Sequence, residues 1–159
     1  MSLPLLSHEF DATAADVRKA ATLSVGEVSA DLRESPTLFG PTSDPSTFAH
    51  LAYGVLIPTE SNLGRVRSRR GATVQVQQDV TVRLSYRLRP NAKGDQLTDH
   101  DASVTDFQVP IVKRIMGFAG SHMPGILWDY VGSDRVVVDS GKWLLTDIQF
   151  TAAHNMVLA

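Results

Sequence analysis

The chain contains no cysteine among its 159 residues. This absence excludes disulfides, thiol nucleophiles and thiolate metal sites. No stretch approaches the run of about 18 apolar residues that a membrane-spanning helix needs. The N-terminus has no basic region ahead of a long apolar one, so we expect no signal peptide. These absences predict a soluble protein that is made in the cytosol and has no membrane partner.

Aromatic residues and net charge are also scarce. Aromatics make up 7% of the chain, and 15 Lys and Arg stand against 17 Asp and Glu, for a net charge of −2. This balance gives no overall electrostatic case for binding nucleic acid or an anionic membrane. The hydrophobic content of 43% is sufficient for a sizeable core. We expect residues 1–159 to form a single domain.

The strongest positive signal is a predicted strand of unusual length, residues 73–89. Apolar and polar side chains alternate along it, which is typical of a strand with one buried and one solvated face. At about 3.3 Å per residue the strand would extend roughly 55 Å, so it must bend, carry a bulge or project beyond its domain. Gln78 alone interrupts the apolar series, which consists of Val74, Val76, Val80, Val82, Leu84, Tyr86 and Leu88.

An amphipathic helix is predicted near the N-terminus, over about residues 11–34. Asp11 or Thr13 is suited to its N-cap. A loop rich in Pro, Ser and Thr follows over residues 35–47, and an α+β core is expected over residues 48–157. The apolar positions of the helix recur at three- and four-residue steps: Val17, Ala21, Val25, Val28 and Leu32.

A second helix is predicted after the long strand, over about residues 98–118. Pro110 falls inside its apolar pattern, so we expect a kink there or a helix that starts near Thr105. Gly117 and Gly120 are expected to mark its end. Its apolar stripe consists of Val104, Phe107, Ile111, Ile115 and Phe118.

Three further strands are predicted, over residues 48–57, 135–138 and 142–157. Pro58 cannot donate to a strand ladder and is expected to end the first of them. Residues 59–72 would then form a long loop that joins this strand to the long one as an antiparallel hairpin. Because strands follow one another rather than alternating with helices, the fold class is α+β. We expect a mainly antiparallel sheet with a long β-hairpin, packed by an N-terminal helix and by a second helix between strands.

The residue types that carry chemistry form no recognisable site. No metal-binding spacing, nucleophile motif or phosphate-binding loop occurs. Three aspartates lie near the start of the second helix, where carboxylates stabilise the helix dipole without any catalytic role. We therefore expect no catalytic residue, no metal, no cofactor and no enzymatic activity. The scattered candidates are His8, His50, His100, His122 and His154, together with Asp99, Asp101 and Asp106.

Arginines supply the sharpest local signal. A cluster in the predicted loop between the hairpin strands suits contact with DNA phosphates or an acidic partner, and it equally suits a solvated hairpin tip. Three more arginines lie on the polar side of the long strand, where an ordinary solvated sheet face is the alternative. The candidate subunit or partner interface therefore consists of Arg65, Arg67, Arg69, Arg70, Arg83, Arg87 and Arg89.

The order of these elements resembles the tail terminator (tail completion) proteins of long-tailed bacteriophages over residues 48–156. The resemblance rests on the strand 48–57 with its polar loop, the long strand ending at Val80-Thr-Val-Arg-Leu-Ser-Tyr-Arg-Leu-Arg-Pro90, the helix within residues 99–116, and the closing strand 143–152. The N-terminal helix is also similar. The Pro-rich loop after it is longer than the smaller members of this family need.

This resemblance implies a homohexameric ring on the last ring of tail-tube subunits. Such a ring stops tube polymerisation, offers a surface to the head-side connector and passes DNA only through its lumen. Family members carry no catalytic residues. The expected location is the tail–neck junction of the virion, after assembly in the host cytoplasm. The alternatives are another neck or tail component, such as a connector component or tube subunit, a DNA-binding module that uses the arginine loop, or a small enzyme.

Overall fold

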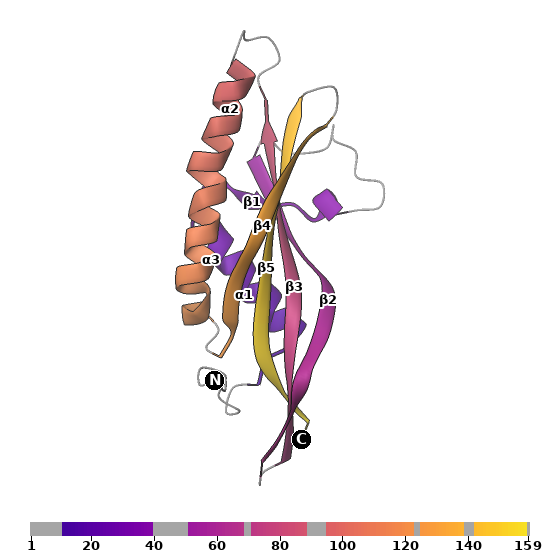
Figure 1. Ribbon diagram of the computed structural model, residues 1–159. Helices are drawn as coiled ribbons and strands as arrows, with labels where there is room; N and C mark the ends of the chain where they lie inside the picture. Colours follow the sequence, from indigo (N-terminus) through magenta and orange to yellow (C-terminus); the bar gives the residue numbers. More distant parts are fainter. Residues whose placement is uncertain are drawn as a thin grey trace.

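A computed structural model describes residues 11–39, 51–68, 71–88, 95–122, 125–138 and 142–158. The strands form one sheet in the order β1-β2-β3-β5-β4, antiparallel except for the short β1–β2 pair (Figure 1). The predicted α+β class is confirmed. The elements are α1 (Ala14–Gly26), β1 (Arg33–Glu34), the 3₁₀ turn η1 (Pro36–Phe39), β2 (Leu51–Ser68), β3 (Gly71–Arg87), α2 (Asp95–Ser103), the π-helical segment η3 (Val104–Gln108), α3 (Val109–His122), β4 (Leu127–Val138) and β5 (Trp143–Leu158).

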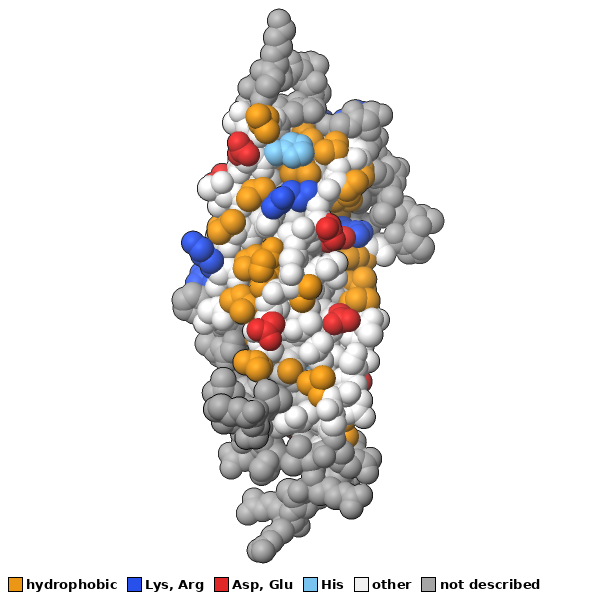
Figure 2. Space-filling view, in the orientation of Figure 1, with side chains coloured by type: hydrophobic (Ala, Val, Ile, Leu, Met, Phe, Trp, Pro, Cys, Tyr) orange, Lys and Arg blue, Asp and Glu red, His pale blue; other side chains and the backbone are white. Residues whose placement is uncertain are grey.

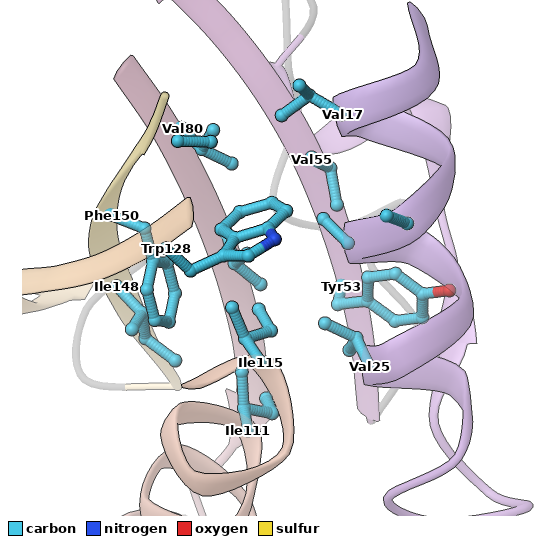
Figure 3. Close-up of a cluster of buried hydrophobic side chains, with 14 of the residues drawn as sticks. Val17, Val25, Tyr53, Val55, Val80, Ile111, Ile115, Trp128, Ile148 and Phe150 are labelled. Atoms are coloured by element: carbon cyan, nitrogen blue, oxygen red, sulfur yellow. The ribbon is translucent and has the colours of Figure 1, made fainter. Parts of the chain in front are cut away.

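The main core lies between the sheet and a layer made of α1 and α3. We call this side of the sheet the helix face and the other side the open face. Side chains from both helices and from four strands meet in this layer (Figure 3). Full burial of each such side chain stabilises the fold by about 1.5–3 kcal/mol. The fully buried members include Val17, Val25, Val82, Leu84, Ile111, Ile115 and Ile148.

Helix α1 begins as predicted and ends early. Thr13 is its N-cap, and the Asp16 carboxylate accepts the backbone N–H of Thr13 at 2.9 Å to complete a capping box. The helix ends at Gly26, well before the predicted end near residue 34. Glycine is a poor helix former, and the chain must leave the helix here to pair Arg33 with β2. Leu32 is still buried, but it lies after the helix at the end of a turn, where its N–H donates to the Ser29 carbonyl at 3.2 Å, directly before β1.

Strand β3 confirms the long strand predicted from alternation. Its apolar series is buried except for the half-buried Tyr86, and Gln78 is buried among it. Residues 89 and 90, where we expected the strand to close, lie outside the described residues.

Strand β2 corrects two predictions. Pro58 does not end the strand, because the pairing with β3 is out of register between Leu56 and Thr59, and this bulge on an outer strand requires no N–H from proline. The predicted loop over residues 59–72 is wrong as well. β2 continues to Ser68 with a second irregularity before Gly64, whose φ of 146° suits glycine alone.

The second helix is continuous from α2 through η3 to α3. It starts earlier than predicted and runs past Gly117 and Gly120 to His122. Immediately before Pro110, the backbone N–H of Val109 bonds to the carbonyl of Val104, one residue further back than in an α-helix. The wider turn accommodates a proline that has no N–H and whose ring crowds the preceding turn.

The remaining strands differ in how well they were predicted. β5 agrees with the expected range to within one residue. β4 starts at Leu127 rather than near residue 135, and it carries a bulge between Tyr130 and Gly132. Of the predicted Pro-rich loop, residues 36–39 form η1 and residues 40–47 lie outside the described residues.

Candidate functional site

The hairpin arm, which we define as β2 residues 59–68 with β3 residues 71–79, carries the first group of candidate arginines. In Figure 1 it extends past the ends of α1 and α3. Arg65 and Arg67 are strand residues, paired with Val74 and Ala72 of β3. Arg69 and Arg70 lie outside the described residues. The two described members of the cluster therefore belong to a β-strand rather than to a long loop.

Arg83 lies far from the arm and already holds partners within its own chain. Its Nε and Nη2 donate to the two carboxylate oxygens of Asp147 at 2.7 and 3.0 Å. Its Nη1 donates to the carbonyl of Leu38 at 3.1 Å, and its guanidinium lies 4.7 Å from the centre of the Phe39 ring. The hydrogen bonds with Asp147 raise the pKa of Arg83 above its ordinary value, so the guanidinium stays charged.

These contacts hold η1 against the open face of the sheet. Leu38 is fully buried there with Ala52 and Trp143 in a second, smaller apolar cluster. Gly54 makes room for the turn, because a Cβ at this position would lie 2.9 Å from the Phe39 ring. The turn η1, which we call the η1 strap, therefore covers part of the open face, and the contacts of Arg83 hold it there.

The candidate arginines that the structure describes do not form one patch. Arg87 is exposed, with its guanidinium 5.9 Å from the centre of the Trp143 ring, and Arg89 lies outside the described residues. Arg83 lies eleven positions along β3 from Ala72, the partner of Arg67, which corresponds to about 36 Å of extended chain. The structure brings Arg83 and Arg87 near one end of the sheet and leaves Arg65 and Arg67 in the arm.

A polar row crosses the arm where β2, β3 and β5 meet. The Gln78 amide donates to Glu60, and its nitrogen lies 3.1 Å from Nε2 of His154. The other ring nitrogen of His154 lies 3.0 Å from the carbonyl of Asn155, so His154 donates through Nδ1 and accepts through Nε2. Gln78 and His154 are fully buried. The break in the sequence alternation thus marks a hydrogen-bonded row inside the sheet.

A hollow of about 500 Å³ lies where the end of α1 faces η3 and the start of α3. Its polar groups are Glu27, Thr105, Lys113 and Arg114, and Arg114 donates to the Glu27 carbonyl at 3.2 Å. These groups contain no nucleophile beside a general base. Among the described residues, no group of three His, Asp or Glu side chains is placed to hold a metal ion.

Sequence reasoning missed the exposed apolar side chains of the outer strands. On β4, Val131 is 60% exposed and Val136 is 55% exposed, and on β2 Leu63 is 47% exposed. Figure 2 shows the side that carries α2, α3 and β4, where hydrophobic side chains are interspersed with single charged ones. The run of three valines at 136–138 was an available signal, because consecutive valines place apolar groups on both faces of a strand.

Comparisons with known proteins do not assign the chain to a family. No family model matches the sequence, and no curated protein matches it significantly. Within the described part of the chain, no helix is long and apolar enough to cross a membrane.

Proposed function

We propose that the protein is a structural component of a long-tailed bacteriophage virion, a tail terminator that forms a ring at the tail–neck junction. The observation that carries the proposal is a sheet whose β2 and β3 strands continue past both helices as the hairpin arm. A ribbon that projects from its own core offers main-chain and side-chain groups to a neighbouring subunit.

A ring of identical subunits requires one surface of each copy to bind a different surface of the next, with closure by rotation. In the proposed assembly six copies sit on the last ring of tube subunits and stop its growth. The opposite side of the ring binds the head-side connector, and DNA passes through the lumen. The arginines of the arm suit an acidic surface on one of these partners, because a guanidinium binds a carboxylate through two parallel hydrogen bonds.

Native mass spectrometry and negative-stain imaging of the purified protein test the proposal. The expected result is a closed ring of defined mass that does not grow with concentration. Tubes of increasing length would instead identify a tube subunit. A monomer that stays monomeric when mixed with tail tubes would contradict the proposal.

The role of the arm is tested by shortening it without disturbing the sheet. Replacing residues 67–72 with Asn-Gly leaves Val66 and Thr73 as the last pair and supplies a two-residue turn. The matched control keeps the length and replaces the four arginines at positions 65, 67, 69 and 70 with serine. We expect the shortened variant to fold and to lose ring formation or tube capping. Salt-dependent DNA binding by the unmodified protein that both variants weaken, with ring formation unchanged, would instead favour a DNA-binding module.

A further inference from the structure

Two long strands lie at the outside of the sheet, and among the described residues their outer sides lack a strand partner over most of their length. No described strand pairs with the outer side of the 12-residue β4, and β1 covers β2 only at Ala52 and Tyr53. Unpaired N–H and C=O groups along such an edge form a template for another strand. Within the described part of the chain, both edges are therefore available for pairing with a second chain.

The direction of the strands makes the two edges compatible with each other. β2, β3, β5 and β4 alternate in direction across the sheet, because each neighbouring pair is antiparallel. With four long strands, the outer two run in opposite directions. When one copy is generated from its neighbour by rotation about an axis parallel to the strands, every strand keeps its direction. β4 of one copy therefore meets β2 of the next as an antiparallel pair. An odd number of long strands would have produced a parallel pair.

Apolar side chains concentrate on these same two strands. Of the ten large hydrophobic side chains that are exposed among the described residues, six lie on β2 or β4. Soluble proteins usually protect long edges with charged side chains, and the end of β4 instead carries Val136, Val137 and Val138. β4 is also firmly seated, since Trp128 is buried in the core and Arg135 Nε donates to Gln108 at 2.8 Å. Asp129, Asp134 and Arg135 place charges on its first part, so the apolar run at 136–138 is the part of this unpaired strand that is suited to a permanent protein contact.

We propose that β4 of one copy pairs with the outer edge of β2 in the next copy, so that the sheets join into a closed wall. This inference rests on the proposed ring and names the surfaces that close it. A symmetric β4–β4 dimer would leave Leu56 and Leu63 of β2 uncovered, whereas head-to-tail pairing covers both strands.

The position of β1 limits the register of this contact. Val136 of β4 pairs with Leu145 of β5, which pairs with Ser85 of β3, and Ser85 pairs with Ala52 of β2. Val136 and Ala52 therefore lie at the same level of the sheet. β1 occupies the outer side of β2 at that level. The neighbouring β4 must therefore be displaced along β2 toward the hairpin arm, and closed sheets require a stagger of this kind.

The chain contains no cysteine, so engineered disulfides can test the register of the strands without competing disulfides from native thiols. Val136→Cys is combined in turn with Leu56→Cys, Thr59→Cys or Ser61→Cys, all exposed and all on the open face. Opposed residues on paired strands lie at distances that a disulfide can bridge. On addition of an oxidant we expect one pair to give a ladder of covalent oligomers that ends at the mass of the ring. The control pairs Val136→Cys with Met116→Cys on α3 and should give no ladder.

The outcomes distinguish a failure of the proposed ring from a failure of the proposed contact between β4 and β2. Rings in native mass without a ladder from any pair would overturn the edge contact and leave the proposed ring intact. A covalent dimer from Val136→Cys alone would indicate β4–β4 pairing and overturn the head-to-tail contact. Monomers in native mass would overturn both proposals.

A second variant tests the contact without a disulfide. Val136→Lys places a charge on the edge at an exposed position, so the monomer should unfold at the same temperature as the unmodified chain. We expect at least a tenfold rise in the concentration needed for rings. Val109→Lys, at an exposed position of α3, should leave that concentration unchanged, and equal effects of the two variants would count against the edge contact.

Discussion

Replacing Arg83 with alanine tests whether this arginine acts inside the subunit or between subunits. In the structure its guanidinium makes two hydrogen bonds to Asp147, one to the Leu38 carbonyl and a stacking contact with Phe39. All four contacts are internal, and together they hold the η1 strap on the open face. We therefore expect Arg83→Ala to lower the stability of the isolated subunit.

The expected loss of stability in Arg83→Ala follows from how exposed the Arg83 and Asp147 side chains are. Fully exposed ion pairs contribute about 0.2–1 kcal/mol, and removal of one partner from a fully buried pair costs about 3–5 kcal/mol. The Arg83 and Asp147 side chains are each 28% exposed, between these limits. We expect a loss of about 2 kcal/mol in the free energy of unfolding, which lowers the Tm of a chain of this size by roughly 4–8 °C.

A double-mutant cycle isolates the pair. Urea unfolding of Arg83→Ala, Asp147→Ala and the double variant should give a coupling free energy of about 1–2 kcal/mol. The pair between Arg18 and Glu34 provides the control: its atoms lie 3.4 Å apart with side chains 52% and 39% exposed. We expect that cycle to give less than about 0.5 kcal/mol.

Two results would refute this reasoning. Additive effects of Arg83→Ala and Asp147→Ala would mean that the salt bridge does not hold the strap. Unchanged subunit stability with lost ring formation would place Arg83 at an interface between subunits, as the sequence predicted.

Two further substitutions report on neighbouring positions of β2. Gly54→Ala should destabilise the fold by about 1–3 kcal/mol in thermal unfolding, because the new Cβ meets the Phe39 ring, and most of this loss should vanish when Phe39 is also replaced by alanine. Tyr53→Phe should cost about 1 kcal/mol through the lost hydrogen bond to the Thr22 carbonyl at 3.2 Å. Burial, aided by Glu34, raises the pKa of Tyr53 above 10, so wild-type stability should fall as pH rises past 10, where the unfolded chain loses this proton first. The phenylalanine variant should lack that component of the fall, and an identical alkaline profile would contradict this assignment.

The alternating strands were predictable because their side chains obey one simple rule. β3 and β5 lie in the interior of the sheet, where each residue faces either the core or the open face, and period two is visible in the sequence. Gln78 was visible as an exception to that rule. Its hydrogen bonds with Glu60 and His154 could not be inferred, because they depend on the register of three strands.

The outer strands were harder to predict because their irregularities interrupt the pattern. Pro58 in β2 and the bulge before Gly132 in β4 would be destructive in a central strand, where both sides of the backbone are paired. An outer strand has one free side and tolerates both. Sequence alone does not say which strand will be outermost, so β2 was ended too early and β4 was started too late.

The candidate site was predictable by residue type but not by arrangement. Arginine at position 83 was identified, but its partner Asp147 lies 64 residues away in the chain. The pairing of Arg83 with Asp147 across β3 and β5 exists only once the register is fixed. For the same reason, the sequence grouped Arg65 and Arg67 of β2 with Arg83 and Arg87 of β3, which the structure places far apart along the sheet.

The polar row of Glu60, Gln78 and His154 affects whether the hairpin arm stays folded in a subunit that has not yet assembled. A ribbon held by apolar packing alone would attract other subunits wherever it met them. Directional hydrogen bonds hold these strands together without adding an adhesive surface. The arm can thus keep its shape in water while a subunit is still free, and its first contact with a partner depends on which groups meet rather than on hydrophobic area alone.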